Sequence, residues 1–115
     1  MSAGTVVNLG ESGRQHVLLG GVQHDESPLL LGVSVVAAEQ TTALIEHDLA
    51  EVAFVLSGDG WLVTEDDGLA FSPGDALLIG AHRWHAIRAG NAEVRMLYVF
   101  PSPDVPPTRT MGANE

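Results

Sequence analysis

Two short polar clusters in the sequence hold residue types that bind metal ions. In the first, residues 46–51, His47 precedes Glu51 by four positions, and Glu51 opens an apolar run. The second cluster, residues 82–85, ends in His85. Imidazole nitrogens and carboxylate oxygens are common ligands of divalent transition metals. If His47, Glu51 and His85 point to one place, they can hold such an ion.

Short strands separated by turns must position these residues. Runs of Val, Leu and Ile alternate with Gly, Asp, Asn, Ser or Pro, and no stretch shows a helical face. The glycine-containing turns 57–60, 66–68 and 89–91 support this pattern. The expected strands lie near 5–9, 15–19, 29–37, 42–47, 51–57, 60–65, 69–72, 76–79, 84–88 and 94–100.

Strands this short must close or stack, because open edges invite aggregation and a single sheet leaves an apolar face bare. The sequence therefore predicts an all-β domain, a barrel or jelly roll, over residues 14–100. Alternate strand positions point inward, so Glu51, Ala53 and Val55 share the interior face. Residues 1–13 are expected to be loose. Residues 101–115 contain four prolines, and we expect a tail that lies along the surface or is disordered.

Composition excludes several functions. The chain has no cysteine, which removes disulfides and thiolate ligands, and no lysine, which removes Schiff-base chemistry by the chain. The net charge of −10 repels a phosphate backbone, so we expect no nucleic-acid partner. No apolar run reaches the roughly 18 residues of a membrane helix, and the start lacks the features of a secretion signal. We therefore expect a cytoplasmic protein that does not enter a membrane.

The two clusters resemble the motifs of the cupin family, and the resemblance spans roughly residues 29–100. His47, Glu51 and the strand Phe54-Val55-Leu56-Ser57-Gly58 match the first motif, but Ile45 stands where the family has another histidine. The run from Gly74-Asp75 to His85 follows the second motif, with Gly80 replacing its proline and His82 replacing its glycine.

The resemblance implies a cupin-type double-stranded β-helix with a divalent metal ion, Fe, Zn, Mn or Ni, held by His47, Glu51 and His85. Two histidines and one carboxylate leave coordination positions open on Fe(II) or Zn(II). Tyr98, His82 and Glu46 are the candidates to replace the lost ligand or to move protons in catalysis.

A small-molecule substrate is expected inside the barrel, in a pocket lined by apolar side chains. The predicted lining comprises Ala53, Val55, Leu62, Leu78 and Ile87. The candidate substrate-binding residues are Arg83, Trp84 and Phe54, and Trp84 is alternatively a packing residue. Arg83, Arg88 and Arg95 are candidates to bind a substrate carboxylate.

Two functions remain open at this point. The first is a metal-dependent enzyme of dioxygenase, isomerase, cyclase or lyase type, a range that includes enzymes of secondary metabolism, as the resemblance implies. The second is a non-catalytic small-molecule-binding barrel, which the loss of a histidine at Ile45 favours. The resemblance also implies a homodimer formed through an outer strand.

Overall fold

A computed structural model describes residues 15–19 and 27–111, and within these ranges the chain forms ten strands and no helix. No described helix could therefore serve as a membrane span. The strands are β1 Gln15–Leu19, β2 Leu30–Val36, β3 Ile45–His47, β4 Glu51–Ser57, β5 Gly60–Thr64, β6 Gly68–Phe71, β7 Ala76–Ile79, β8 His85–Ala89, β9 Val94–Phe100 and β10 Thr108–Thr110.

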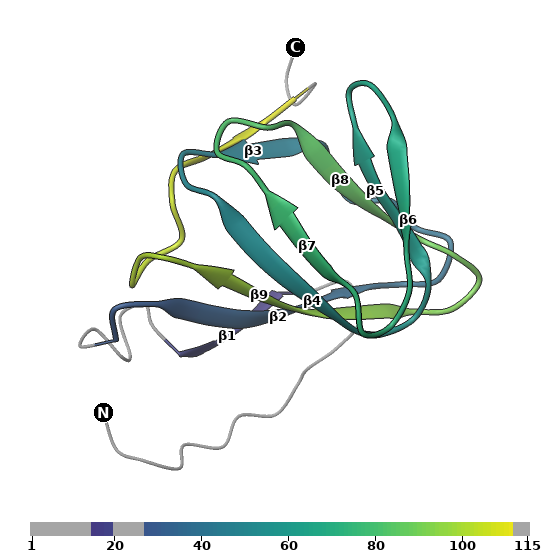
Figure 1. Ribbon diagram of the computed structural model, residues 1–115, viewed down its shortest axis with the longest axis horizontal. Helices are drawn as coiled ribbons and strands as arrows, with labels where there is room; N and C mark the ends of the chain where they lie inside the picture. The colour runs from purple at the N-terminus through teal and green to yellow at the C-terminus, as the bar shows by residue number, and fades with distance from the viewer. Residues whose placement is uncertain (1–14, 20–26, 112–115) are drawn as a thin grey trace.

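The strands form two antiparallel sheets that face each other (Figure 1), ordered β1-β2-β9-β4-β7 and β10-β3-β8-β5-β6. Consecutive strands β3 and β4 lie in different sheets, as do β7 and β8. This crossing between layers is the double-stranded β-helix of a jelly roll, which confirms the expected fold class.

Side chains from both sheets meet in one apolar core. Val55 and Val94 are fully buried and Met96 nearly so, and they pack with Leu62 and Phe71 of the other sheet. Along β9 the burial alternates residue by residue, as expected for a strand with one face inward. The core closes one end of the barrel, and the other end stays open.

One glycine sets the turn between β4 and β5. Gly58 has φ +85°, and a Cβ atom there would lie 2.2 Å from the carbonyl oxygen of Glu93. Only glycine fits both constraints without displacing backbone.

The expected strands in the described ranges agree with the structure to within a few residues, and the expected strand at 5–9 lies outside them. Strand 42–47 is shorter than expected, because only residues 45–47 pair. The clear difference is β10. Residues 108–110 were expected to belong to a tail, but they pair with all three residues of β3 (Figure 1).

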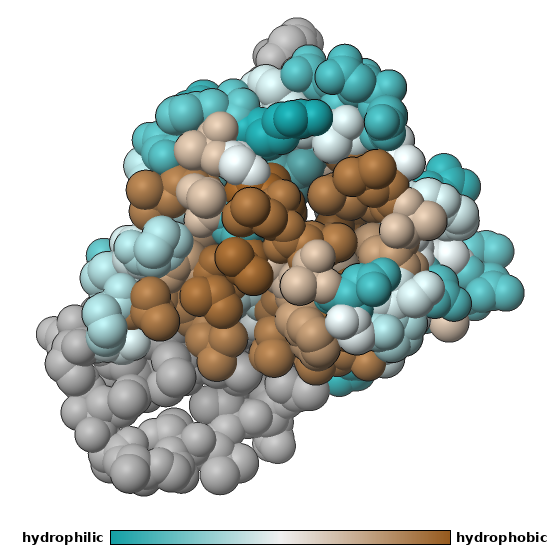
Figure 2. All heavy atoms as spheres, viewed as in Figure 1, coloured by the Kyte–Doolittle hydropathy of each residue, from teal (hydrophilic) through white to brown (hydrophobic). Residues whose placement is uncertain are grey.

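The outer face of the first sheet is apolar. Figure 2 shows apolar side chains gathered over β4 and β7, with polar residues around them. Val52, Phe54 and Leu56 of β4 and Leu78 of β7 are all exposed there, and Val52 and Leu78 are cross-strand partners. We call these four residues the outer apolar face.

Candidate metal centre

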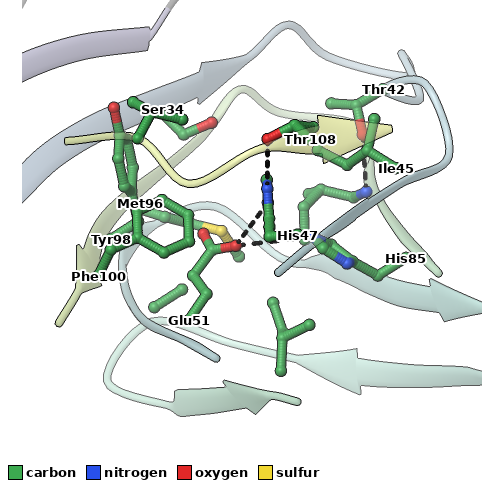
Figure 3. A pocket seen from close by; sticks show the side chains of 14 residues that line it. Ser34, Thr42, Ile45, His47, Glu51, His85, Met96, Tyr98, Phe100 and Thr108 are labelled. Atoms are coloured by element: carbon green, nitrogen blue, oxygen red, sulfur yellow. Dashed lines mark hydrogen bonds and ion pairs between the residues drawn. The ribbon is translucent and has the colours of Figure 1, made fainter. Parts of the chain in front are cut away.

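A cavity of about 320 Å³ lies between the two sheets, and Ala53, Ile79 and Met96 of the apolar core form part of its wall. Figure 3 shows the side chains around it. Eight of the lining residues are apolar or aromatic. The lining comprises Ser34, Thr42, Ile45, His47, Glu51, Ala53, Ile79, His85, Ile87, Met96, Tyr98, Phe100, Val105 and Thr108.

Three strands bring His47, Glu51 and His85 to one wall of this cavity. His47 ends β3, Glu51 begins β4 and His85 begins β8. Oε1 of Glu51 lies 3.3 Å from Nε2 of His47 and 3.6 Å from Nε2 of His85. One donor atom from each of the three residues lies within 4.8 Å of the others. The convergence predicted from the sequence is therefore present in the geometry.

Each imidazole has its other nitrogen engaged. Nδ1 of His85 lies 2.9 Å from the carbonyl oxygen of Arg83. A carbonyl only accepts, so this nitrogen carries a proton, and Nε2, which faces Glu51, is the nitrogen of His85 that can bind a second proton or a metal ion. Nδ1 of His47 lies 2.7 Å from Oγ1 of Thr108. Both rings thus turn Nε2 toward the same carboxylate oxygen.

That carboxylate oxygen is poorly satisfied. Oε1 of Glu51 is buried and has no hydrogen-bond partner among the described residues. Burial acts to raise the pKa of Glu51, but the two facing imidazoles lower it by more, so its net pKa lies below the ordinary 4.5. Glu51 is therefore ionised at neutral pH, facing the Nε2 atoms of His47 and His85, while its Oε1 has no hydrogen-bond partner among the described residues.

The pKa of His85 moves the other way. Burial acts to lower it, but Glu51 and the carbonyl of Arg83 outweigh burial and raise it above the ordinary 6.5. A positive charge is therefore favoured at the point where the three groups meet.

These residues fit a divalent metal ion. Two inward-facing Nε2 atoms, which offer lone pairs when they are not protonated, plus one carboxylate oxygen without a hydrogen-bond partner, make a donor set suited to Zn(II), Fe(II) and similar ions. Ile45 lines the cavity beside them and supplies no ligand atom.

Tyr98 faces the cavity, which is the orientation that a role at the site requires. Its side chain is 2% exposed and lies over Gly32 of the neighbouring strand, where a Cβ atom would come within 2.4 Å of the phenol oxygen. Figure 3 shows that oxygen on the side of Ser34, pointing away from Glu51. Burial and the charge of Glu51 raise the pKa of Tyr98, so the phenol stays protonated at neutral pH.

Glu46 and His82, the candidates to replace the lost ligand or to move protons, do not line the cavity that His47, Glu51 and His85 border. Glu46 follows Ile45 on β3 and therefore points to the opposite side. Its Oε1 lies 3.3 Å from Nδ1 of His82 and 2.9 Å from Nη2 of Arg109, which also pairs with Asp48. Burial acts to raise the pKa of Glu46, but Arg109 and His82 lower it by more. Arg109 therefore supplies the positive charge that balances Glu46 and Asp48 in this cluster.

His82 also has an unusual backbone. Its φ of 61° lies in the left-handed region, which glycine adopts readily. The cupin motif has glycine at this position. His82 therefore adopts the left-handed backbone conformation that glycine favours, although the residue here is a histidine.

Phe54 and Leu78 are directed away from the cavity, and both expectations for them were wrong. Phe54 is 43% exposed and Leu78 is 75% exposed. The alternation along β4 that turns Glu51 and Ala53 inward turns Phe54 outward. The neighbouring Ile79 lines the cavity in place of Leu78.

Within the described ranges, no arginine lines the cavity. Arg83 is exposed, and neither it nor Trp84 borders the cavity. Arg88 lies over the ring of Trp61 at 5.9 Å, and Arg95 pairs with Glu93 at 2.7 Å. The expected lining residues Val55 and Leu62 belong to the closed core, whereas Ala53 and Ile87 line the cavity as expected.

Sequence reasoning missed the contribution of the carboxyl-terminal segment. Val105 and Thr108 line the cavity, and Thr108 contacts His47. Nothing in the proline-rich residues 101–107 indicates that a strand follows. Ser34, Thr42, Met96 and Phe100 were also missed, although strand alternation places Met96 and Phe100 on the same face as Tyr98.

A family model described as a cupin domain matches residues 32–100. A comparison with curated protein sequences finds no match.

Several solved structures have the same fold. The polyketide cyclase RemF from Streptomyces resistomycificus is 23% identical, with a TM-score of 0.73 over 84% of this chain and 69% of that one. A cupin 2 domain-containing protein from Halorhodospira halophila is also 23% identical, with a TM-score of 0.78 over 90% and 72%. The DMSP lyase DddQ from Ruegeria pomeroyi is 17% identical, with a TM-score of 0.77 over 89% of this chain and 53% of that one.

Proposed function

Because this chain belongs to the cupin domain family, we propose that it is a metal-dependent enzyme that acts on a small, largely apolar and uncharged molecule. His47, Glu51 and His85 hold the metal ion. The observation that carries the proposal is the buried Oε1 of Glu51, which faces two Nε2 atoms and has no hydrogen-bond partner among the described residues.

When bound, a divalent ion supplies Lewis-acid polarisation of a substrate oxygen or activates a water molecule. The chain's own residues bind and orient the substrate. Ile45, Ile79 and Phe100 give the cavity apolar walls that exclude water and strengthen polar interactions inside it.

The substrate class follows from charge. No arginine of the described ranges lines the cavity, and Glu51 contributes a negative charge to its wall. The whole chain has a net charge of −10. Apart from the metal ion, whose charge Glu51 partly offsets, a carboxylate or phosphate substrate finds no arginine of the described ranges in the cavity, whereas an uncharged carbonyl or hydroxyl compound needs none.

Tyr98 is the residue we assign to the substrate's polar group. Its phenol stays protonated and so remains a hydrogen-bond donor inside the cavity. Ser34 lines the same side and adds a second hydroxyl. These groups give an otherwise apolar cavity a preferred orientation for a substrate oxygen.

Metal content and turnover test the proposal together. Purified protein should carry close to one Zn, Fe, Mn or Ni ion per chain, and His85→Ala should lose it. His82→Ala is the matched control, because His82 is exposed and outside the cavity; it should retain the metal.

Turnover should then be screened with uncharged compounds that contain a carbonyl or hydroxyl group, with carboxylates of the same size alongside, in air and without oxygen. Turnover of uncharged compounds that is lost in His85→Ala supports the enzyme. A protein that holds metal and binds such compounds without converting them is instead a binding barrel. Absence of metal from the wild type, or a preference for carboxylates, contradicts the assignment.

A further inference from the structure

We propose that Thr108 is a positioning residue of the metal centre, because its hydroxyl holds the proton of His47 on Nδ1 and so leaves Nε2 open toward the ion. The proposal rests on the metal-binding function above and adds to it a residue of β10.

The first observation is the way in which β3 is held. This strand has three residues, and among the described pairs it meets β8 at one position, Ile45 opposite His85. On its other side all three residues pair with β10, and His47 lies opposite Thr108. The backbone of His47 is therefore held by this pairing with β10 and by a hydrogen bond from the N–H of His82 to its carbonyl oxygen, 2.7 Å long.

The second observation concerns the hydroxyl of Thr108. Its oxygen lies 2.9 Å from the carbonyl oxygen of Pro106 and 2.7 Å from Nδ1 of His47. A hydroxyl has one proton, and the carbonyl of Pro106 only accepts. With the hydroxyl proton donated to Pro106, the oxygen accepts from His47, and Nδ1 must carry the hydrogen.

This tautomer is the one that metal binding needs. Nε2 of His47 then carries a lone pair and faces Glu51, 3.3 Å away. Figure 3 shows the imidazole between the Thr108 hydroxyl on one side and the Glu51 carboxylate on the other. The Arg83 carbonyl does the same for His85. Outer partners of this kind orient metal-binding histidines and set their tautomers.

Arg109 secures the same strand on its opposite side. It contacts Glu46 and Asp48 of the β3 region, so β10 is anchored independently of the Thr108 hydroxyl. A substitution that removes only that hydroxyl should therefore leave the strand in place.

The test compares Thr108→Val, which removes the acceptor at constant shape, with Thr108→Ser, which restores it. Thr110→Val is the matched control, because Thr110 lies on the same strand and has no contact with His47 among the described residues. Two quantities are measured for each protein. They are the tautomer of His47 by nitrogen chemical shifts of the metal-free protein at alkaline pH, and the Zn(II) dissociation constant by competition with a chelator.

In the wild type, Thr108→Ser and Thr110→Val, His47 should be protonated on Nδ1. In Thr108→Val the population protonated on Nε2 should rise, and Zn(II) should bind roughly 10- to 100-fold more weakly, the usual effect of losing an outer partner. An unchanged tautomer in Thr108→Val, or a loss that Thr108→Ser does not restore, would overturn the proposal. The tautomer is read without metal, so it decides the role of Thr108 even if the wild type fails to bind Zn(II) and the proposed function itself fails.

Discussion

Tyr98 lies across the backbone of Gly32, its partner on the adjacent strand, and fills the space that any side chain at position 32 would need. A Cβ atom at Gly32 would lie 2.3 Å from Cζ of Tyr98. The glycine is thus what allows a bulky phenol to lie flat along the cavity wall.

Gly32→Ala should therefore displace Tyr98 and lower the free energy of unfolding by roughly 1–3 kcal/mol, the usual cost of overpacking. Urea denaturation measures it. In a Tyr98→Ala background the same substitution should be neutral or stabilising, because the space is free and alanine suits a strand better than glycine. Equal costs in both backgrounds would show that the ring and the glycine do not interact.

Glu51→Gln should destabilise the metal-free protein most between about pH 4.5 and 6.5. The raised pKa of His85 contributes stability that is present below 6.5 and is lost as the pH rises through its folded value. The lowered pKa of Glu51 contributes stability that is present above 4.5 and is lost as the pH falls through its folded value. Urea denaturation across this range tests the expectation, with Glu65→Gln in the exposed β5–β6 turn as the control. A pH-independent effect of Glu51→Gln would contradict it.

Ile45→His should strengthen metal binding. Ile45 lines the cavity two residues before His47, so both side chains leave β3 on the same face. An added imidazole there should tighten Zn(II) binding by about tenfold or more, since structural zinc sites use four protein ligands. Ile45→Val is the control and should bind Zn(II) as the wild type does. Affinity that is unchanged or weaker in Ile45→His would mean that position 45 cannot reach the ion.

We propose that two copies of the chain associate through the outer apolar face, in line with the homodimer that the sequence suggests. Leu78 is 75% exposed there, so Leu78→Glu should convert a dimer to a monomer with little effect on the stability of the fold. Sedimentation equilibrium measures the mass.

Leu69→Glu is the matched control for this experiment. Leu69 is also exposed, but it lies on β6 in the other sheet. The variant should remain dimeric. A wild type that sediments as a monomer, or equal dissociation of both variants, would place the interface elsewhere or exclude it.

The sequence predicts the barrel well because the barrel depends on local alternation, and two motifs predict the close approach of His47, Glu51 and His85. Glu51, Ala53 and Val55 point inward for the same reason that Phe54 points outward, so the error at Phe54 came from not applying the alternation to every residue. Glu46 could have been assigned to the outside in the same way, from its place next to His47.

Other features depend on contacts between distant segments. Thr108 lies 61 positions from His47 in the sequence. The prolines before it do not predict a strand, and the three residues of β10 are defined as a strand by their pairing with β3. Arg109 likewise donates a hydrogen bond to Glu46, which lies 63 positions away in the sequence. Periodicity within a short window carries no information about such partners.

The register of β3 and β10 has a consequence for biosynthesis. The ribosome makes the chain from its amino end, so His47, Glu51 and His85 all emerge before residue 108. Until that residue follows, β3 is held by the pair of Ile45 with His85 and by the hydrogen bond from the N–H of His82 to the carbonyl oxygen of His47. Under the proposed function, an ion that binds before β10 docks would meet His47 without its outer partner, and the complete set of contacts would form only after residue 108 has joined β3.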